Sequence, residues 1–247
     1  MAKTIEIKHV NKGYMLGEEK VPVLRDINFE VEEGEFVAIL GPSGSGKTTL
    51  MNIIGCMDIL DSGEYYLHGR AIHEMEEKDL TEVRNKEIGF IFQGFNLISN
   101  LTAIENVELP LMYNSSVSAT ERRKRAIEAL KAVGLGDRLE HKSNQMSGGQ
   151  MQRVAIARAL VNNPAVILAD EATGNLDTRT SFEILVLFQK LHAEGRTIIF
   201  VTHNPEIAQY SSRNIVLRDG QVKDDKPNRN ILNAAETLAA LPKQEDD

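Results

Sequence analysis

Hydrophobic and polar residues alternate in two stretches near the beginning of the chain. In residues 4–10 one side carries Ile5, Ile7 and His9, and in residues 27–31 one face carries Ile27, Phe29 and Val31. Such alternation is typical of a strand with one buried face. We therefore predict that both stretches belong to an antiparallel sheet.

Continuous apolar runs form a second pattern, at residues 35–40, 88–92, 165–169 and 197–201. Runs of this kind are expected of strands that are buried on both faces. Helical stretches fall between them, the first over residues 48–54 after a glycine-rich turn, and short strands at 214–217 and 221–222 close the fold. The alternation of strands and helices predicts an α/β fold with a mostly parallel sheet and helices on both faces.

The middle of the chain, from about residue 96 to 163, has few strand-like segments and is dominated by helical patterning. Ser118 and Glu121 have the spacing of a capping box at the start of a helix. That helix would bury one face, made of Ala126, Ile127, Leu130 and Val133. We interpret this region as a helical subdomain inserted into the α/β core.

The end of the chain is more polar. We predict a main domain over residues 1–223 and a tail over residues 224–247. Within the tail, five apolar residues could share a helix face and dock as a terminal helix: Ile231, Leu232, Ala235, Leu238 and Leu241.

Composition narrows the class of protein. No apolar run approaches the roughly 20 residues needed to cross a bilayer, and residues 1–4 do not open a signal sequence. We therefore expect a cytosolic chain that reaches a membrane only through a partner.

The net charge of −8 disfavours nucleic acid as a partner, and we interpret the basic run Arg122–Arg125 as a solvated helix face. The single cysteine, Cys56, excludes an internal disulfide, and we expect it to be a buried, inert thiol.

A phosphate-binding loop is the first motif that carries chemistry. Its residues fit G-x-x-x-x-G-K-[ST] between a buried strand and a helix: Gly41, Pro42, Ser43, Gly44, Ser45, Gly46, Lys47 and Thr48, with Thr49 next. Glycines let backbone N–H groups approach phosphate oxygens, and the helix directs its N-terminus at the same anion. Lys47 would contact the β- and γ-phosphates, and the Thr48 hydroxyl would ligate Mg²⁺.

Two carboxylates end the apolar run at residues 165–169. Asp170 would reach the Mg²⁺ shell and Glu171 would polarise the attacking water. A phosphate loop followed by an apolar strand ending in Asp is the general pair of nucleoside triphosphatases. The sequence therefore predicts a P-loop NTPase core with its own catalytic base.

A third motif shows a family resemblance. The segment Met146, Ser147, Gly148, Gly149, Gln150, followed by residues 152–160, resembles the signature of ABC (ATP-binding-cassette) ATPases, and the resemblance extends to about residue 223. Ser147 stands at a helix N-cap, and the glycines leave backbone donors open for a second anion site. In the family this site meets the γ-phosphate bound to the other subunit. The resemblance thus implies a two-fold dimer that closes on two ATP molecules.

Other residues match the family in order along the chain. Tyr14 stands where the family stacks an aromatic ring on adenine. Gln93 matches the glutamine that senses Mg²⁺ and couples to the membrane subunit, so the resemblance implies catalytic and metal-binding roles for it. Residues 174–177, ending in Asp177, resemble the loop that links the two nucleotide sites, and His203 matches the histidine that contacts the γ-phosphate.

The segments at 55–58, 89–97, 101–111 and 174–177 resemble one branch of the family. This branch contains ATPases of lipoprotein release, macrolide export and resistance to antimicrobial peptides. It implies an integral-membrane permease as partner, with residues 95–111 beside its coupling helix. Three residues depart from the family pattern: Met146 for Leu, Met151 where Gln is common, and Ala172 for the Pro after the Walker B Glu.

Three alternatives remain open at this stage. One is an ABC ATPase of nucleic-acid transactions, although such proteins have a long coiled-coil insertion or two cassettes in one chain. Another is a nucleotide-dependent switch with weak hydrolysis, which Ala172 alone favours. The third, a P-loop kinase or GTPase, is disfavoured by residues 146–150.

Overall fold

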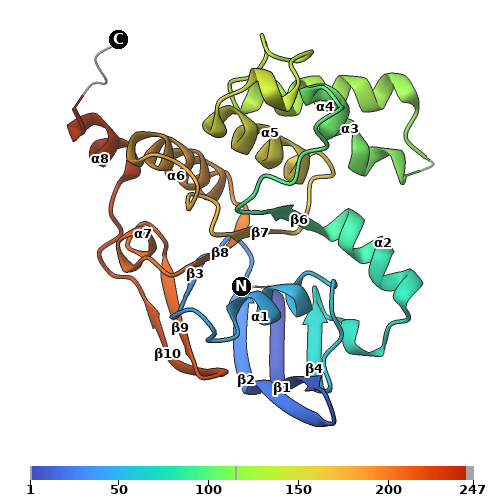
Figure 1. Ribbon diagram of the computed structural model, residues 1–247, viewed down its shortest axis with the longest axis vertical. Coiled ribbons are helices and arrows are strands. Elements are labelled where there is room, and N and C mark those ends of the chain that lie inside the picture. Colours follow the sequence, from blue (N-terminus) through green and yellow to red (C-terminus); the bar gives the residue numbers. More distant parts are fainter. Residues whose placement is uncertain (1, 115, 243–247) are drawn as a thin grey trace.

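The computed structural model describes residues 2–114 and 116–242. Its long axis carries an antiparallel sheet at one end and a group of helices at the other, with a mostly parallel sheet between them (Figure 1). The three parts agree with the predicted α/β class, the antiparallel subdomain and the inserted helical subdomain. The predicted fold class is therefore confirmed.

The antiparallel sheet has four strands in the order β2-β1-β4-β5. Their bounds are β1 Lys3–Leu16, β2 Glu19–Glu32, β4 Ser62–Leu67 and β5 Arg70–Ala71. Ile27, Phe29 and Val31 are buried as the alternation predicts.

The alternation of β1 slips at His9, where the prediction was wrong. His9 has φ 53 and is exposed, and Val10 takes the buried position in its place. The pairing of β1 with β2 shifts register between Ile7 and Val10, which is a β-bulge. The His9 N–H donates to Asn28 Oδ1 at 2.8 Å, and this bond satisfies the donor that the bulge removes from the ladder.

The central sheet has six strands in the order β10-β9-β3-β8-β7-β6. Their bounds are β3 Phe36–Leu40, β6 Ile88–Ile91, β7 Val166–Asp170, β8 Thr197–Thr202, β9 Arg213–Arg218 and β10 Gln221–Pro227. All neighbours are parallel except β9 and β10. Because β10 continues to Pro227, the predicted boundary at residue 223 falls inside a strand.

Both faces of the central sheet are covered. Val166 and Leu168 of β7 pack into one hydrophobic core with α1 (Lys47–Ile54) and the antiparallel sheet. Ile167 and Ala169 pack into a second core with the helices of the other face. This double burial explains the continuous apolar runs of the sequence.

The helices on the second face are α3 (Ala103–Met112), α4 (Ala119–Ala132), α5 (Gly148–Leu160) and α6 (Thr178–Ala193), and α2 (Glu77–Glu87) leads into β6. Short 3₁₀ turns occupy Ile72–Glu74 and Ser143–Gln145, and α7 (Pro205–Ala208) follows β8. The Ser118 side chain caps α4 by accepting the Glu121 N–H, but the Glu121 carboxylate binds Arg125 at 2.7 Å. Only the Ser118 half of the predicted capping box therefore forms.

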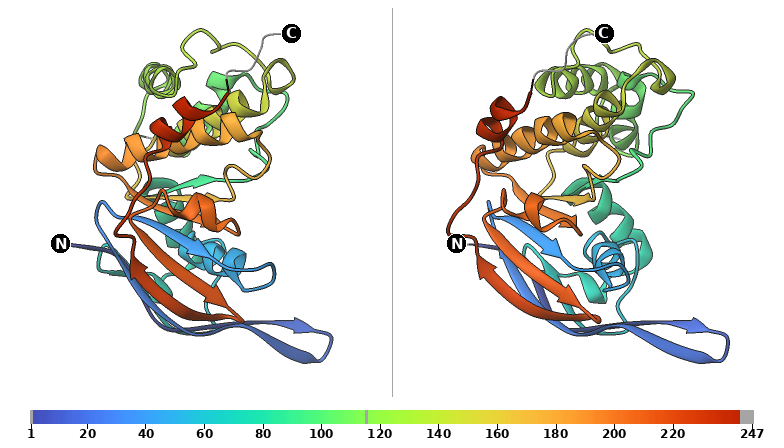
Figure 2. Two further views of the ribbon diagram at one scale, coloured as in Figure 1. Left: turned by 90° about the vertical axis from the view of Figure 1, so that its left-hand side faces the viewer. Right: turned by 60° about the vertical axis from the view of Figure 1, so that its left-hand side comes forward.

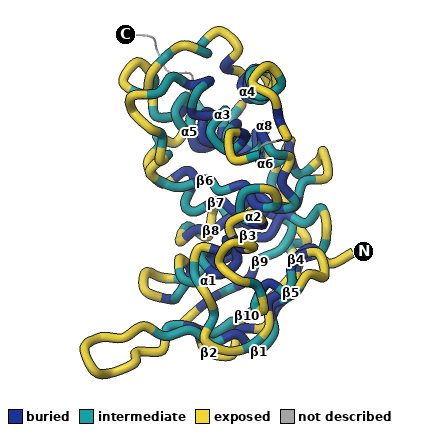
Figure 3. The backbone as a smooth tube through the Cα atoms, turned by 90° about the vertical axis from the view of Figure 1, so that its right-hand side faces the viewer, coloured by how far each residue is buried: buried dark blue, intermediate teal, exposed yellow. Residues whose placement is uncertain are grey.

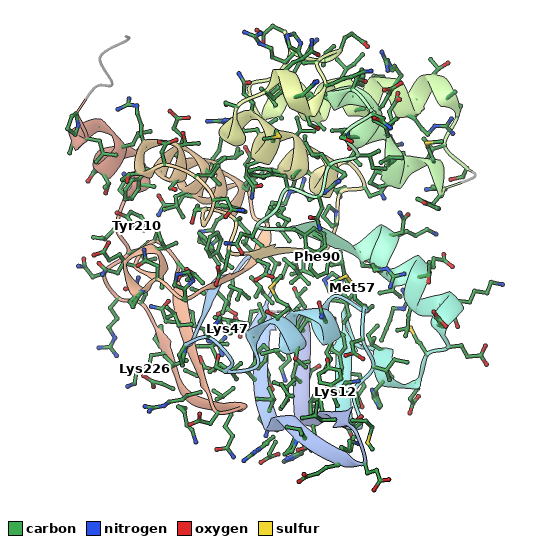
Figure 4. All side chains as sticks on the ribbon, viewed as in Figure 1. Lys12, Lys47, Met57, Phe90, Tyr210 and Lys226 are labelled. Carbon is green, nitrogen blue, oxygen red and sulfur yellow. The ribbon has the colours of Figure 1, made fainter. Side chains whose placement is uncertain are left out.

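The tail packs along α6, near Tyr210 (Figure 4). Gln189 Nε2 donates to the Leu232 carbonyl at 2.7 Å, and Gln189 Oε1 accepts the Ala234 N–H at 2.9 Å. Helix α8 spans only Ala234–Ala240, because Asn233 caps it there. Ile231 and Leu232 precede the helix and Ala235 is exposed, so the predicted shared helical face was wrong. Residues 243–247 of the predicted tail lie outside the described residues.

Among the described residues, no helix has the length and apolar character to span a membrane.

Candidate functional site

The predicted catalytic and metal-binding residues gather at one edge of the central sheet. β3 ends before Gly41, β6 before Gln93, β7 at Asp170 and β8 before His203. These strands are parallel neighbours, with Leu40 beside Thr202 and Asp170 beside Val201. Their carboxyl ends therefore bring residues from four distant segments to one place, the usual location of ligand sites in α/β sheets.

The phosphate loop joins β3 to α1. Lys47 opens α1, and only 8% of its surface is exposed (Figure 4). Its ammonium donates to the carbonyls of Gly41 at 2.8 Å and Pro42 at 2.9 Å. The loop thus holds the lysine under its own backbone, beside the α1 N-terminus, where an anion is favoured.

Two glycines of the loop are required by its shape. Gly46 has φ 100, a conformation that other residues rarely adopt. A Cβ on Gly41 would lie 2.2 Å from the Leu217 carbonyl oxygen. Pro42, Ser43, Gly44 and Thr48 are exposed along the rim, Thr49 is half-buried and Ser45 is buried below them. The exposed loop surface is the part available to a ligand.

The two carboxylates at the end of β7 have different surroundings. Burial raises the pKa of Asp170, and repulsion from Glu171 adds to this, whereas the Lys47 charge lowers it. Glu171 has φ 43, and its N–H donates to the Val201 carbonyl at 2.9 Å. Its carboxylate Oε1 lies 2.7 Å from His203 Nδ1. A neutral imidazole that donates from Nδ1 would fix the direction of this carboxylate.

Gln93 lies at the same edge but is turned toward the loop at 174–177. Its Nε2 donates to Asn175 Oδ1 at 3.4 Å, and Asn175 Nδ2 donates back to the Gln93 carbonyl at 3.0 Å. A Cβ on Gly174 would lie 2.7 Å from Gln93 Nε2, so glycine is what allows this approach. The reciprocal amide pair was not predicted, and sequence spacing carries no signal for it.

The signature segment begins α5. Ser147 Oγ accepts the Gln150 N–H at 3.3 Å, and Gln150 Oε1 accepts the Ser147 N–H at 3.0 Å, which makes a complete capping box. Ser147 is exposed and Gly148 partly so. Asp177 caps α6 with its carboxylate, which accepts the Thr180 N–H at 2.9 Å and the Thr180 hydroxyl at 2.6 Å. In Figure 1, α5 lies among the helices at the far side of the central sheet from α1. The structure therefore does not bring Ser147 to the phosphate loop of the same chain.

Comparison with known proteins identifies this arrangement. The model of the family described as "ABC transporter" matches residues 24–174. The chain belongs to the ABC transporter family. It is an ATP-binding protein of that family and an ATPase.

Three of the similar proteins show the range of the resemblance. An ABC transporter ATP-binding protein of Thermotoga maritima is 54% identical over 223 residues, which are 90% of this chain and 95% of that protein. The macrolide export ATP-binding/permease protein MacB of Bdellovibrio bacteriovorus is 47% identical over 241 residues, 98% of this chain but 36% of MacB. The chain thus spans about a third of that relative.

The third is a solved structure. It is the ATP-binding cassette MJ0796, described as a dimer in a post-hydrolysis state bound to ADP and Pi. It superimposes with a TM-score of 0.83 at 48% identity, and the match covers 91% of this chain and 99% of that one. The protein of this name in the sequence comparison is from Methanocaldococcus jannaschii.

Gln152 connects the signature helix α5 with the segment that follows β7. The sequence analysis did not predict this contact. Gln152 is fully buried, and its Nε2 donates to the Ala172 carbonyl at 2.8 Å. Ala172 directly follows Glu171, the predicted base, and is itself buried. The contact connects α5 with the residue after Glu171. The position of Gln152 inside the signature helix was the one sequence feature that could have indicated this contact.

Tyr14, the predicted adenine-stacking residue, lies on the β1–β2 hairpin and is 42% exposed. Its hydroxyl donates to Asp58 Oδ2 at 2.5 Å. Burial raises the pKa of this phenol, the bond to Asp58 raises it further, and the Thr49 hydroxyl lowers it. Tyr14 therefore lies near Thr49, the residue that follows the phosphate loop.

Proposed function

We propose that this cassette works as a homodimer with Mg²⁺ and two ATP molecules and drives a membrane permease, in export, lipoprotein release or mechanotransmission. One observation carries the proposal. The Glu171–His203 pair lies at the strand edge that also holds Lys47, whereas the signature helix of the same chain presents Ser147 to the outside. The Glu171–His203 pair can activate water. Ser147 and the N-terminus of the signature helix can contact a γ-phosphate only if another copy of the chain binds it.

The dimer follows from this division of the site. Two copies related by a two-fold axis would place Ser147 and the α5 N-terminus of each copy over the phosphate loop of the other. Backbone N–H groups at a helix N-terminus bind anions. The dimeric state described for MJ0796 supports this arrangement.

The catalytic step assigns one role to each group. Glu171 accepts the proton of the attacking water, and His203 keeps the Glu171 carboxylate oriented through the 2.7 Å contact. Lys47 and the signature donors of the second copy stabilise the charge on the transferring phosphoryl group. Closing the dimer aligns the attacking water with the γ-phosphate, and this alignment lowers the activation barrier.

The donors at this edge suit Mg²⁺. It prefers oxygen ligands and is usually held by one or two carboxylates together with substrate phosphates. Thr48 and Asp170 would hold it, with Gln93 if its amide turns away from Asn175. The raised pKa of Asp170, caused by burial and by Glu171, marks an acidic pair whose repulsion a cation would relieve. Bound there, Mg²⁺ would neutralise charge on the β- and γ-phosphates.

A groove beside the Gln93 loop suits the permease. It has a volume of about 950 Å³ and lies between α2, β6 and α3. Its apolar lining includes Met57, Phe90, Phe92, Ile98 and Leu109, and Met57 and Phe90 lie near each other in Figure 4. Exposed apolar grooves accept amphipathic helices. The fused ATP-binding/permease composition that MacB's name describes supports a permease segment as the occupant.

In this account the cassette lies on the inner face of the cell membrane, is held there by the permease, and does not insert into lipid. The net charge of −8 disfavours a nucleic-acid partner.

The test is ATP hydrolysis in Mg²⁺ as a function of protein concentration. We expect a rate that rises faster than linearly in wild type and falls about 100-fold or more in Glu171→Gln, as for loss of a general base. Glu206→Gln, an exposed change in α7, is the matched control and should keep the wild-type rate. A Glu171→Gln protein as active as wild type would refute the assignment of the base.

A further inference from the structure

The tip of the β1–β2 hairpin extends beyond the sheet to which it belongs (Figure 2). β4 pairs with β1 only as far as Asn11, so the following residues of β1 have β2 as their sole strand neighbour. Register shifts lie on both sides of Lys12. Figure 3 shows most of this hairpin as exposed. Because a two-stranded ribbon is marginally stable alone, the ladder does not by itself fix the direction of the Tyr14 ring.

A short turn, residues 58–61, binds this part of the hairpin. The Lys12 ammonium donates to Asp58 Oδ1 and to the Ile59 carbonyl, both at 2.6 Å. The Gly13 N–H donates to Asp61 Oδ2 at 2.7 Å. The Tyr14 hydroxyl donates to Asp58 Oδ2 at 2.5 Å. Three successive residues of β1 are thus tied to one turn.

Asp58 is the centre of these contacts, since both of its carboxylate oxygens are used. Burial acts to raise its pKa, but the hydrogen bonds from Lys12, Tyr14 and the Ile59 N–H outweigh burial and lower it. Asp58 is therefore ionised at neutral pH, where it accepts both bonds. The Lys12 side chain is only 11% exposed, so this ion pair is partly shielded from water.

Lys12 also restricts the Tyr14 ring directly. Its ammonium lies 5.0 Å from the ring centroid, which covers one face of the ring by a cation–π contact. The ring retains 42% exposure. One face is occupied by the cation, and the exposed remainder of the ring is the surface that a planar base can reach.

We propose that Asp58 is a positioning residue for the nucleotide base: through the Tyr14 hydroxyl and Lys12 it holds the Tyr14 ring where adenine stacks. This rests on the proposed function and on the family resemblance, which implies that Tyr14 stacks on adenine. Asp58 does not touch the phosphates, so its loss weakens binding of nucleotides and spares a ligand without a base.

The experiment is a double-mutant cycle on ATP hydrolysis with Asp58→Asn, Tyr14→Phe and the double variant. Lys12 and Tyr14 donate to different oxygens of Asp58, and the Asp58→Asn side chain would turn an NH2 donor toward one of these two donors. Each single change should raise KM for ATP about fivefold, as expected for a half-exposed charge-assisted hydrogen bond, with kcat within about twofold. The double variant should have nearly the same KM as Tyr14→Phe alone. Glu18→Ala, at the exposed turn of the same hairpin, should change neither constant.

Two further measurements separate the base from the phosphates. Inorganic tripolyphosphate, which has no base, should inhibit hydrolysis with the same Ki in wild type, Asp58→Asn and Tyr14→Phe. The chain contains no tryptophan, so Tyr14→Trp introduces a single tryptophan, whose fluorescence should respond to ADP and not to tripolyphosphate.

The proposal is overturned if Asp58→Asn raises KM by the same factor in the Tyr14→Phe protein as in wild type, or raises the Ki of tripolyphosphate in step with KM. It is also overturned if KM stays unchanged in either single variant. Tyr14→Phe removes only a half-exposed hydroxyl, so it tests the same contact if Asp58→Asn fails to fold in a melting experiment. Failure of the proposed function would look different, because the wild-type rate would then rise only linearly with protein concentration, or Glu171→Gln would be as active as wild type.

Discussion

The phosphate loop and the signature segment each lead into the N-terminus of a helix, where an anion is favoured. The surroundings of these two N-termini differ. Around the phosphate loop, Lys47 is 8% exposed and held by loop carbonyls, and Asp170, Glu171 and His203 converge on it from neighbouring strands. Around the signature helix, Ser147 is exposed, and its hydroxyl accepts the Gln150 N–H of its own first turn. One region is a nearly complete site, and the other is half of a site.

The capping box explains how the signature helix can remain exposed without loss of stability. Ser147 and Gln150 satisfy each other's backbone donors. The N–H groups of Gly148 and Gly149 belong to the first turn, which has no carbonyl partner within its own helix. The chain therefore keeps donors for an anion that must come from outside. In the proposed dimer, the nucleotide site is therefore complete only when two copies meet.

Lys47→Met and Ser147→Asp should give the largest effects and separate the two regions. Both should reduce hydrolysis about 100-fold or more, as for loss of a charge-stabilising group. Only Lys47→Met should abolish nucleotide binding by the monomer, whereas Ser147→Asp should bind ATP like wild type. Asp is a good N-cap, so this change keeps the α5 cap and adds a repulsive charge. Calorimetric titration of each variant with ATP tests the difference, and loss of monomer binding in Ser147→Asp would contradict it.

A medium effect is expected where α5, the signature helix, contacts α6, which follows the loop at residues 174–177. A Cβ on Gly149 would lie 2.4 Å from Thr180 Cγ2, and Thr180 is held in place by two hydrogen bonds to Asp177. Gly149→Ala should therefore lower stability by about 1 kcal/mol, as overpacking outweighs the gain in helix propensity.

Thermal melting measures this as a fall in Tm of about 2–4 °C. Adding Thr180→Ser, which removes Cγ2 and keeps the hydroxyl, should restore Tm. A Gly149→Ala protein that melts like wild type would show that α5 and α6 are not packed as described.

The smallest predicted change in Tm concerns Asp170 at the end of β7, and it depends on pH in a defined way. Burial and Glu171 raise the pKa of Asp170 in the folded state. An ionised Asp170 thus costs stability above its folded pKa, and the cost disappears below its unfolded pKa. Asp170→Asn should raise Tm of the nucleotide-free protein by about 2 °C at pH 8 and by less at pH 4.5, while Mg²⁺-dependent hydrolysis is lost.

Melting curves of wild type and variant at the two pH values are the check. A variant that is less stable than wild type at pH 8 would mean that Asp170 is not under electrostatic strain.

The parts of the fold that the sequence predicted correctly share one physical property, which is that a single local pattern determines them. Runs such as residues 165–169 are apolar because both faces of β7 are buried. The phosphate loop is recognisable because its backbone path needs glycine and its anion needs Lys47. Where a local hydrogen bond competed, the pattern failed: Asn28 stabilises a bulge at His9, and Arg125 withdraws Glu121 from its cap.

The contacts between elements could not be predicted in the same way. Gln152 with Ala172, Gln93 with Asn175, and Tyr14 with Asp58 all join segments that meet only after the chain has folded. The family resemblance indicated that Gln93 and Tyr14 matter, and it carried no information on their partners. The roles of the individual site residues stay predictions that the proposed variants test.

The most direct test of the central claim is the mass of the Glu171→Gln protein with and without ATP, measured by sedimentation beside the Glu171→Gln/Ser147→Asp protein. The account predicts a dimer of Glu171→Gln with ATP, a monomer without it, and a monomer of the double variant even with ATP bound. A Glu171→Gln protein that binds ATP and stays monomeric, or a double variant that dimerises equally well, would contradict the division of the site between two copies.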